Sequence, residues 1–333
     1  MRPLLRRLLS ILFLALASAG AGFAVLTWAP IGLSADTVEF TIEPGSSLRA
    51  ALREIAAAGA DLDRWVIVVL ARLTGVESSI KAGSYAISRG TTPIDLLRKL
   101  TRGDFDQAEV ALIEGWTFRQ WRERLDAHPD LRHDTAGLGD EEIMQRIGAA
   151  GIPAEGAFFP DTYLFARGSS DVDLLARAYR AMHAHLAREW AARTAGLPYR
   201  SPAEALVIAS LVEKETGHAD DRPLVAGVLV NRLRSGMPLQ SDPTVIYGIG
   251  AGFDGNLRRR DLLADTPWNT YTRRGLPPTP IAMVGLASLR AALNPAPGAA
   301  LYFVARGDGS SHFSRTLAEH NDAVTRYQKG GQR

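Results

Sequence analysis

The chain has 333 residues, 46% of them hydrophobic, which is enough for one or two domains with a sizeable core. Its formal net charge is only +2, so the sequence gives no argument for a nucleic-acid partner, which would need a concentrated basic face. There is no cysteine, which excludes a disulfide scaffold, a thiolate nucleophile and a cysteine-ligated metal.

The N-terminal segment has the pattern of a membrane anchor. Three arginines lie among the first seven residues, and residues 8–35 carry no charge. The apolar part, residues 8–28, has the length of a membrane-spanning helix, and the arginines before it orient the N-terminus toward the cytoplasm. A cleaved signal peptide is the alternative, because residues 17–19 (ASA) resemble a cleavage site. We expect an uncleaved, single-pass anchor within residues 1–36.

Residues 37–108 are predicted to form a small α/β unit. Its apolar residues alternate in two short strands and recur at helical spacing between and after them. No residue in this unit suggests chemistry, so we interpret it as a packing or binding module. The expected elements are strands at 37–42 and 83–88 and helices at 47–58, 62–73 and 92–100.

A larger α+β region is expected from Glu109 onward. His183 and His185 lie on a helix predicted over residues 171–195, about 200° apart around its axis, so they do not form a metal-binding pair. The other elements expected before residue 200 are a strand at 110–113, a helix capped by Thr117 and an aromatic, proline-containing turn at 155–163.

The helix predicted over residues 202–215 is the candidate carrier of chemistry. A capping box and a proline at the first helical position mark its start at Ser201. Leu206–Val212 is apolar on every side, which indicates a helix that is buried all round. This helix ends with two carboxylates, Glu213 and Glu215.

Carboxylates on a buried helix are costly unless they are used or paired. Glu213 and Glu215 lie about 200° apart, so they cannot face one cleft and form an acid–base dyad. A carboxylate at the negative end of a helix, among apolar neighbours, should have a raised pKa and act as a proton donor, for example to a glycosidic oxygen. The alternative is that both glutamates only make salt bridges at the helix end.

Three loops rich in proline, asparagine and aromatic residues follow, and such loops commonly line a site on a rigid scaffold. They span residues 239–249, 266–271 and 275–281 and are too proline-rich for regular elements. Motifs of other catalytic schemes (G-x-S-x-G, HExxH and glycine-rich phosphate loops) do not occur in the sequence. A hairpin over 301–313 and a helix capped by Thr316 complete the prediction.

Several motifs resemble the endolytic murein transglycosylases of the YceG-like family, and the similarity extends from the N-terminal span to the final helix. The motifs are IASLVEKETG (208–217), NRL (231–233), LQSDPTVIYG (239–248), WNTY (268–271), GLPP (275–278), NP (294–295), YFVA (302–305) and HN (320–321).

The resemblance implies an α+β protein in three parts. These are a cytoplasmic tail and transmembrane anchor (1–36), a LysM-like module facing the periplasm (37–108) and a catalytic domain with a buried catalytic helix (109–333). It implies a single-pass protein of the cell inner membrane that cleaves the β-1,4 bond between MurNAc and GlcNAc in nascent peptidoglycan strands. The product would carry 1,6-anhydro-MurNAc ends, and cleavage would terminate glycan elongation. Peptidoglycan synthases are candidate partners, and no cofactor or metal is expected.

In the family, the catalytic glutamate is the second acid of the EKET run, which is Glu215 here. We expect Glu213 to be a supporting residue. One carboxyl is enough for this reaction, in agreement with the helix geometry. Two alternatives stay open. The first is that Tyr247 and Tyr271 are buried core aromatics, and the second is that Asp242 caps the turn made with Pro243. Glu155 and Asp161 are expected to brace loops. The expected sugar and peptide contacts are Gln240, Asp242, Thr244, Tyr247, Asn269 and Tyr271.

Two other functions compete with this one. A non-catalytic, peptidoglycan-binding membrane scaffold of a wall-synthesis complex would use the LysM-like module alone. A pyridoxal-phosphate lyase is disfavoured by the N-terminal span and by the lack of a cofactor phosphate site in the sequence.

Overall fold

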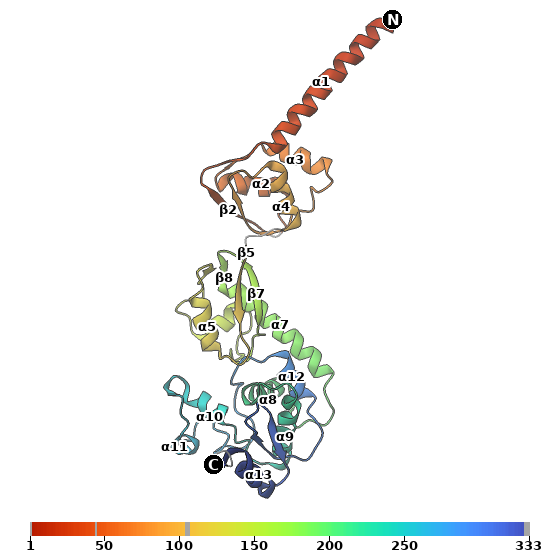
Figure 1. The fold of residues 1–333 in the computed structure, drawn as a ribbon. Helices are drawn as coiled ribbons and strands as arrows, with labels where there is room; N and C mark the ends of the chain where they lie inside the picture. The colour runs from red at the N-terminus through yellow and green to blue at the C-terminus, as the bar shows by residue number, and fades with distance from the viewer. Residues whose placement is uncertain (1, 44, 104–106, 330–333) are drawn as a thin grey trace. The chain divides into compact units, whose positions relative to one another are not determined.

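The structure is a computed structural model that describes residues 2–43, 45–103 and 107–329 (Figure 1). It divides into an N-terminal unit (residues 1–109 with 164–168) and a C-terminal unit (residues 110–163 with 169–333). The outer limits of the predicted parts, residues 1 and 333, lie outside the described residues. A mixed α+β fold is confirmed.

Helix α1 (Arg2–Trp28) opens the N-terminal unit. It contacts α3 and α4, and the ring of Phe23 lies 6.1 Å from that of Trp65. Over the described part of the chain, no helix combines the length and the apolarity needed to cross a membrane. The anchor predicted over residues 8–28 therefore stays a prediction.

The rest of the N-terminal unit has the order strand, strand, helix, strand, helix, strand, helix. Strands β2 (Thr37–Ile42) and β4 (Gly83–Ser88) pair antiparallel, and the short strands β1 (Gly32–Leu33) and β3 (Ala60–Asp61) form a second pair. The apolar faces of the strands and helices share one core that includes Phe40, Leu52 and Tyr85. These elements confirm the α/β unit predicted from the sequence. The helices are α2 (Leu48–Ala57), α3 (Arg64–Leu73) and α4 (Pro93–Arg102).

The first part of the C-terminal unit contains short strands and two helices around an aromatic cluster. Phe158, from the predicted aromatic turn, stacks on Phe118 with ring centroids 5.1 Å apart. Strand β5 pairs with β7, and β6 runs parallel to β8. The helices are α5 (Phe118–Asp126) and α6 (Asp140–Arg146), and the short strands are β6 (Leu131–Arg132) and β8 (Ser169–Ser170). Strands β5 (Gln107–Leu112) and β7 (Asp161–Ala166) each have residues in both units.

The core of the C-terminal unit is built around α8 (Pro202–Glu215), which packs against α7, α9 and α12 (Figure 1). Every residue of α8 from Ala205 to Val212 is buried, as the sequence predicted. Ser201 Oγ caps the helix by accepting from Glu204 N at 3.2 Å. The surrounding helices are α7 (Asp171–Ala191), α9 (Asp221–Ser235) and α12 (Leu286–Leu293).

The segment predicted as a proline-rich loop at 239–249 contains a helix, α10 (Asp242–Ile249). The prediction was wrong here because Pro243 stands in the first turn, where a missing N–H breaks no helical hydrogen bond. A short helix, α11 (Arg259–Leu263), follows. The predicted hairpin is confirmed as β9 (Tyr302–Ala305) and β10 (Ser311–Ser314), and Thr316 caps α13 (Leu317–Val324).

Candidate active site

Glu215 is the last residue of α8 and is partly buried. The helix ends there because Thr216 takes an extended conformation, with φ −148° and ψ 132°. The carboxyl therefore sits where the helix dipole is negative, directly after the buried part of the helix. This position favours the protonated acid over the carboxylate.

Ser241 provides the closest polar partner of Glu215. Its hydroxyl donates to Glu215 Oε1 at 2.6 Å, across 26 positions of sequence. Burial raises the pKa of Glu215 to about 7, against the opposing effect of the Ser241 hydrogen bond, while Asp242 raises it further and Arg232 lowers it. A carboxyl with this pKa populates both protonation states near neutral pH, so it can give and take back a proton.

The segment that carries Ser241 is fixed by a buried arginine and by Thr270. Arg232, on α9, donates to Leu239 O at 2.6 Å and to Leu301 O at 2.7 Å. Gln240 N–H donates to Thr270 O at 3.1 Å, and Ser241 N–H donates to Thr270 Oγ1 at 3.0 Å. Hydrogen bonds therefore hold the backbone on both sides of Gln240, at Leu239 and at Ser241.

Asp242 and Tyr271 lie together beside Glu215. The Tyr271 hydroxyl donates to Asp242 Oδ1 at 2.5 Å. Burial raises the pKa of Tyr271, and the charges of Asp242 and Glu215 raise it further. Tyr271 is half-buried and Asp242 is exposed, so this pair borders the carboxyl and stays accessible to a ligand.

Thr244 and Asn269 are both fully buried, and their predicted substrate contacts stay predictions. The Thr244 hydroxyl donates to Ser241 O at 2.6 Å and lies 2.9 Å from Thr270 Oγ1. The Asn269 amide donates to Ala264 O at 2.7 Å and accepts from Tyr271 N at 2.8 Å. Both residues brace the loops behind the site.

Tyr247 contacts a different carboxyl. Its hydroxyl donates to Glu155 Oε2 at 3.1 Å, and its ring meets Trp268 edge-on at 5.3 Å between centroids. Glu155 also accepts from Phe118 N at 3.1 Å. Glu155 thus links α5 to α10, which fits its predicted bracing role, and Tyr247 fits the alternative of a core aromatic. Asp161 accepts from Thr162 N, a local contact.

Glu213 faces surroundings different from those of Glu215, as the helix geometry predicted. Its Oε2 accepts from Gly285 N at 3.0 Å, where α12 begins. Burial raises the pKa of Glu213, and the nearby charge of Glu114 adds to this effect. The hydrogen bond from Gly285 N–H connects Glu213, and with it α8, to α12.

Several residues near Glu215 have no predicted role from the sequence. Ser241 and Arg232 belong to motifs that carry the family resemblance, which was the available signal. Tyr302 and His320 also lie in such motifs. The Arg232 guanidinium lies 5.4 Å from the Tyr302 ring centroid, and His320 stacks on the same ring at 5.3 Å. Burial lowers the pKa of His320, and Arg232 lowers it further.

One group of described residues has the composition of a metal site. Ligand atoms of Asp126, His133 and Asp171 all lie within 4.8 Å of one another. However, the buried Asp171 carboxylate already accepts from the backbone N–H and the hydroxyl of Thr135. We therefore interpret this group as a brace between β6 and α7.

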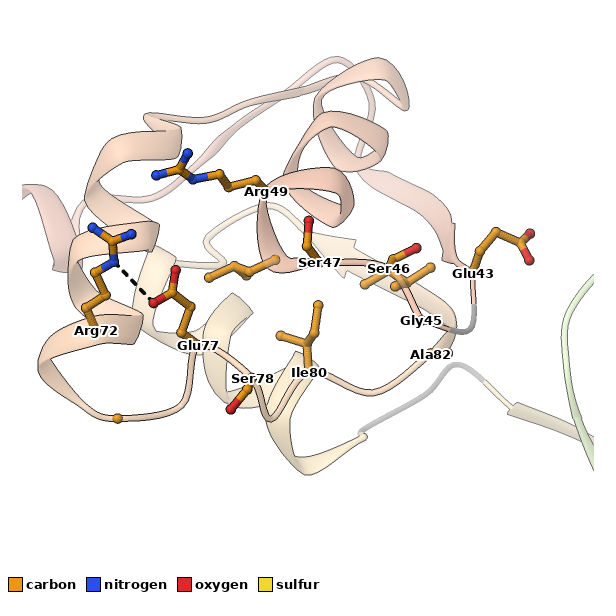
Figure 2. Close-up of a pocket in the computed structure, with 13 residues that line it drawn as sticks. Glu43, Gly45, Ser46, Ser47, Arg49, Arg72, Glu77, Ser78, Ile80 and Ala82 are labelled. Atoms are coloured by element: carbon orange, nitrogen blue, oxygen red, sulfur yellow. Dashed lines mark hydrogen bonds and ion pairs between the residues drawn. The ribbon is translucent and has the colours of Figure 1, made fainter.

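The N-terminal unit contains a separate polar pocket of about 780 Å³ (Figure 2). Ser46, Ser47 and Arg49 line it at the start of α2, and Arg72 lines it near the end of α3. Arg72 Nε pairs with Glu77 Oε2 at 3.1 Å. The lining therefore combines hydroxyls, a paired cation and anion, and a second arginine, Arg49, which together offer polar contacts to a ligand.

A partly buried carboxyl with a pKa near neutrality, at the end of a buried helix and beside an accessible Tyr271–Asp242 pair, has the features of a one-carboxyl acid/base site. The chain belongs to the YceG-like family, whose model matches residues 40–326. The family membership predicted from the motifs is confirmed.

Named relatives point to the same family. The chain is 31% identical over 267 residues to the endolytic murein transglycosylase of Bacillus subtilis, covering 75% of this chain and 74% of that protein. It is 28% identical over 287 residues to the endolytic murein transglycosylase of Streptococcus pneumoniae, of which it spans only 51%. A crystal structure of a yceG-like protein from Listeria monocytogenes matches 87% of this chain and 99% of its own, with a TM-score of 0.56 and 28% identity.

Proposed function

We propose that the protein is an endolytic peptidoglycan lytic transglycosylase in which Glu215 is the catalytic acid and base. The observation that carries the proposal is the Glu215 carboxyl, whose pKa is raised by burial to about 7 and which has the Ser241 hydroxyl on one oxygen. The family and the names of the relatives support the reaction class.

In the proposed reaction, the bond between C1 of MurNAc and O4 of GlcNAc breaks as Glu215 gives its proton to O4. Glu215, now a carboxylate, accepts the proton of the MurNAc 6-hydroxyl while O6 bonds to C1. The products are a free 4-hydroxyl and a 1,6-anhydro end, and Glu215 regains its proton. No water is consumed, so a second carboxylate to activate water is not needed.

The substrate contacts in this proposal are Asp242 and Tyr271, with the exposed amide of Gln240. They border Glu215 on the segments that Arg232 and Thr270 hold in place. Hydroxyl and carboxylate groups at this position suit the hydroxyls and N-acetyl groups of a glycan. Cleavage inside nascent strands would terminate their elongation, which makes peptidoglycan synthases the candidate partners.

We further propose that the N-terminal unit is a LysM-like module that binds glycan in the pocket of Figure 2. Support comes from the order of β2, α2, α3 and β4, in which only the two-residue strand β3 separates the helices, and from the polar lining of the pocket. In a binding assay with purified glycan strands, Ser47→Trp should weaken retention without changing the turnover of short glycan fragments. Unchanged retention would remove this pocket from the proposal.

The proposed location is the inner membrane, with residues 37–333 in the periplasm. The uncharged stretch at 8–35 and the arginines before it support this location. A reporter that functions only in the periplasm, fused to the C-terminus, should be active. An inactive reporter would reverse the orientation, and a mature N-terminus near Ala19 would replace the anchor with a cleaved signal.

The test of function is the digestion of glycan strands by wild type, Glu215→Gln and Glu213→Gln. Glutamine keeps the shape of Glu215 but has no useful acidity, so activity should disappear while the fold is retained. Glu213→Gln is the matched control, because its amide oxygen still accepts from Gly285 N–H, and it should retain activity.

The digestion products separate the proposed function from its competitors. Anhydro ends without label from heavy-oxygen water indicate the transglycosylase, whereas labelled reducing ends would indicate a hydrolase. Binding without products would favour the scaffold.

A further inference from the structure

We propose that Ser241 is a positioning residue that holds Oε1 of Glu215 and thereby makes Oε2 the oxygen that transfers the proton. This inference rests on the proposed function of Glu215. It adds a residue to the machinery and assigns different tasks to the two oxygens of one carboxyl.

The hydrogen bond itself argues for this division. Ser241 Oγ donates to Oε1 at 2.6 Å, and the serine is only 2% exposed. A hydroxyl has one proton to donate, and an oxygen that accepts it is the carbonyl-like oxygen of a neutral carboxyl. The acidic proton of Glu215 is therefore placed on Oε2, for which the described residues provide no hydrogen-bond partner.

The backbone that carries the Ser241 hydroxyl is fixed by hydrogen bonds on both sides. The Ser241 N–H donates to Thr270 Oγ1, and the Ser241 carbonyl accepts a hydrogen bond from the Thr244 hydroxyl at 2.6 Å. On the other side, Arg232 holds Leu239 O at 2.6 Å. With these groups fixed, the backbone of Ser241 cannot move away from Glu215 without breaking several buried hydrogen bonds.

The backbone conformation of Gln240 indicates that the surrounding structure holds the segment before Ser241 in an unfavourable geometry. Its φ is +51°, and among the described residues it is the only one other than glycine with a positive φ. A side chain in this region is unfavourable unless its surroundings hold it there, and such strain is found at sites with a functional geometry. The left-handed turn at Gln240 directs the next residue, Ser241, toward the end of α8.

The same contact serves both halves of the reaction. While Glu215 is neutral, Ser241 occupies Oε1 and leaves Oε2 for the leaving oxygen. After the proton has moved, Ser241 remains a donor and stabilises the carboxylate that has formed. Ser241 thus favours release of the proton and keeps Oε2 oriented to accept the proton of the 6-hydroxyl.

The test compares Ser241→Ala and Ser241→Thr in the full-length protein, with Ser210→Ala as the matched control. Ser210 also lies in the core and is fully buried, but its hydroxyl donates to Val207 O and does not contact Glu215. The readouts are kcat and KM across pH, and a carbon-13 NMR titration of the Glu215 carboxyl, which does not require activity.

Ser241→Ala should lower kcat by about ten-fold or more with little change in KM, since the lost hydrogen bond is to an ionisable group. Without this donor the carboxylate is less stable, so the NMR titration and the alkaline limit of activity should both move upward by about one pH unit. Ser241→Thr keeps the hydroxyl, so its NMR titration and its alkaline limit of activity should match those of wild type. Ser210→Ala should also leave the titration and the alkaline limit unchanged.

A Glu215 titration in Ser241→Ala that matches wild type would overturn the inference, even if the variant were less active or less stable. Absence of anhydro products from wild type would instead refute the proposed function, and the NMR titration would still decide whether Ser241 controls the Glu215 carboxyl.

Discussion

Burial of Glu215 makes a prediction about stability that does not depend on the identity of the substrate. The folded protein holds the proton of Glu215 up to a pKa of about 7, whereas the ordinary value is 4.5. Below pH 4.5 the carboxyl is protonated in both the folded and the unfolded chain, so it costs no stability. Between pH 4.5 and 7 the unfolded chain loses the proton first, and stability falls as the pH rises.

The magnitude follows from the difference between the two pKa values. One unit corresponds to about 1.4 kcal/mol, so above pH 7 the charged Glu215 lowers the free energy of unfolding by about 3 kcal/mol. Glu215→Gln carries no charge at any pH and avoids this penalty. The variant should therefore match wild type at pH 4 and exceed it by about 3 kcal/mol at pH 8.5.

Urea unfolding of both proteins at a series of pH values measures this difference. Contributions from Glu155 and Glu213 are common to the two proteins and cancel. The comparison at pH 4 serves as the internal control for any change of packing caused by the amide. A difference in unfolding free energy that stays the same from pH 4 to 8.5 would refute the argument that the Glu215 carboxyl is desolvated.

Three further substitutions test the surroundings of Glu215. Gln240→Gly should raise the free energy of unfolding by about 1 kcal/mol, because glycine accepts a positive φ, and should raise KM if the amide contacts the sugar as proposed; an unchanged KM would remove that contact. Asn269→Ala should cost about 1–3 kcal/mol in urea unfolding, since it leaves buried loop groups unpaired, and a variant of wild-type stability would contradict its bracing role. Tyr271→Phe should lower kcat/KM by about ten-fold with little loss of stability, because it removes the hydroxyl bonded to Asp242; equal kcat/KM values would place Tyr271 outside the site.

The sequence predicted best those features that local patterns determine. The cap at Ser201, the uniformly apolar run and the terminal carboxylates predicted α8 and its buried environment, and the structure confirms them. Alternating residues predicted β2 and β4. In contrast, α10 was not predicted, because residues 239–249 were judged too proline-rich for a regular element. A proline in the first turn, such as Pro243, is compatible with a helix.

The site was harder to predict because its contacts are tertiary. Ser241 and Glu215 are 26 positions apart, and no local rule relates them. Polar residues in an aromatic, proline-containing loop can face a ligand or hold the loop itself. Thr244 and Asn269 hold the loop, and only their complete burial reveals this.

A raised pKa alone does not identify the catalytic carboxyl of this protein. Burial raises the pKa of Glu155 to about 7 as well, and Glu155 lines an apolar pocket of about 650 Å³. However, its carboxylate already accepts from the Phe118 N–H and the Tyr247 hydroxyl, so proton transfer from it would disturb the contacts that join α5 to α10. Glu215 has one oxygen held by Ser241 and the other without a partner among the described residues. Because an acid/base group needs an oxygen that can reach its substrate, the hydrogen-bond geometry favours Glu215 where the two pKa values do not distinguish them.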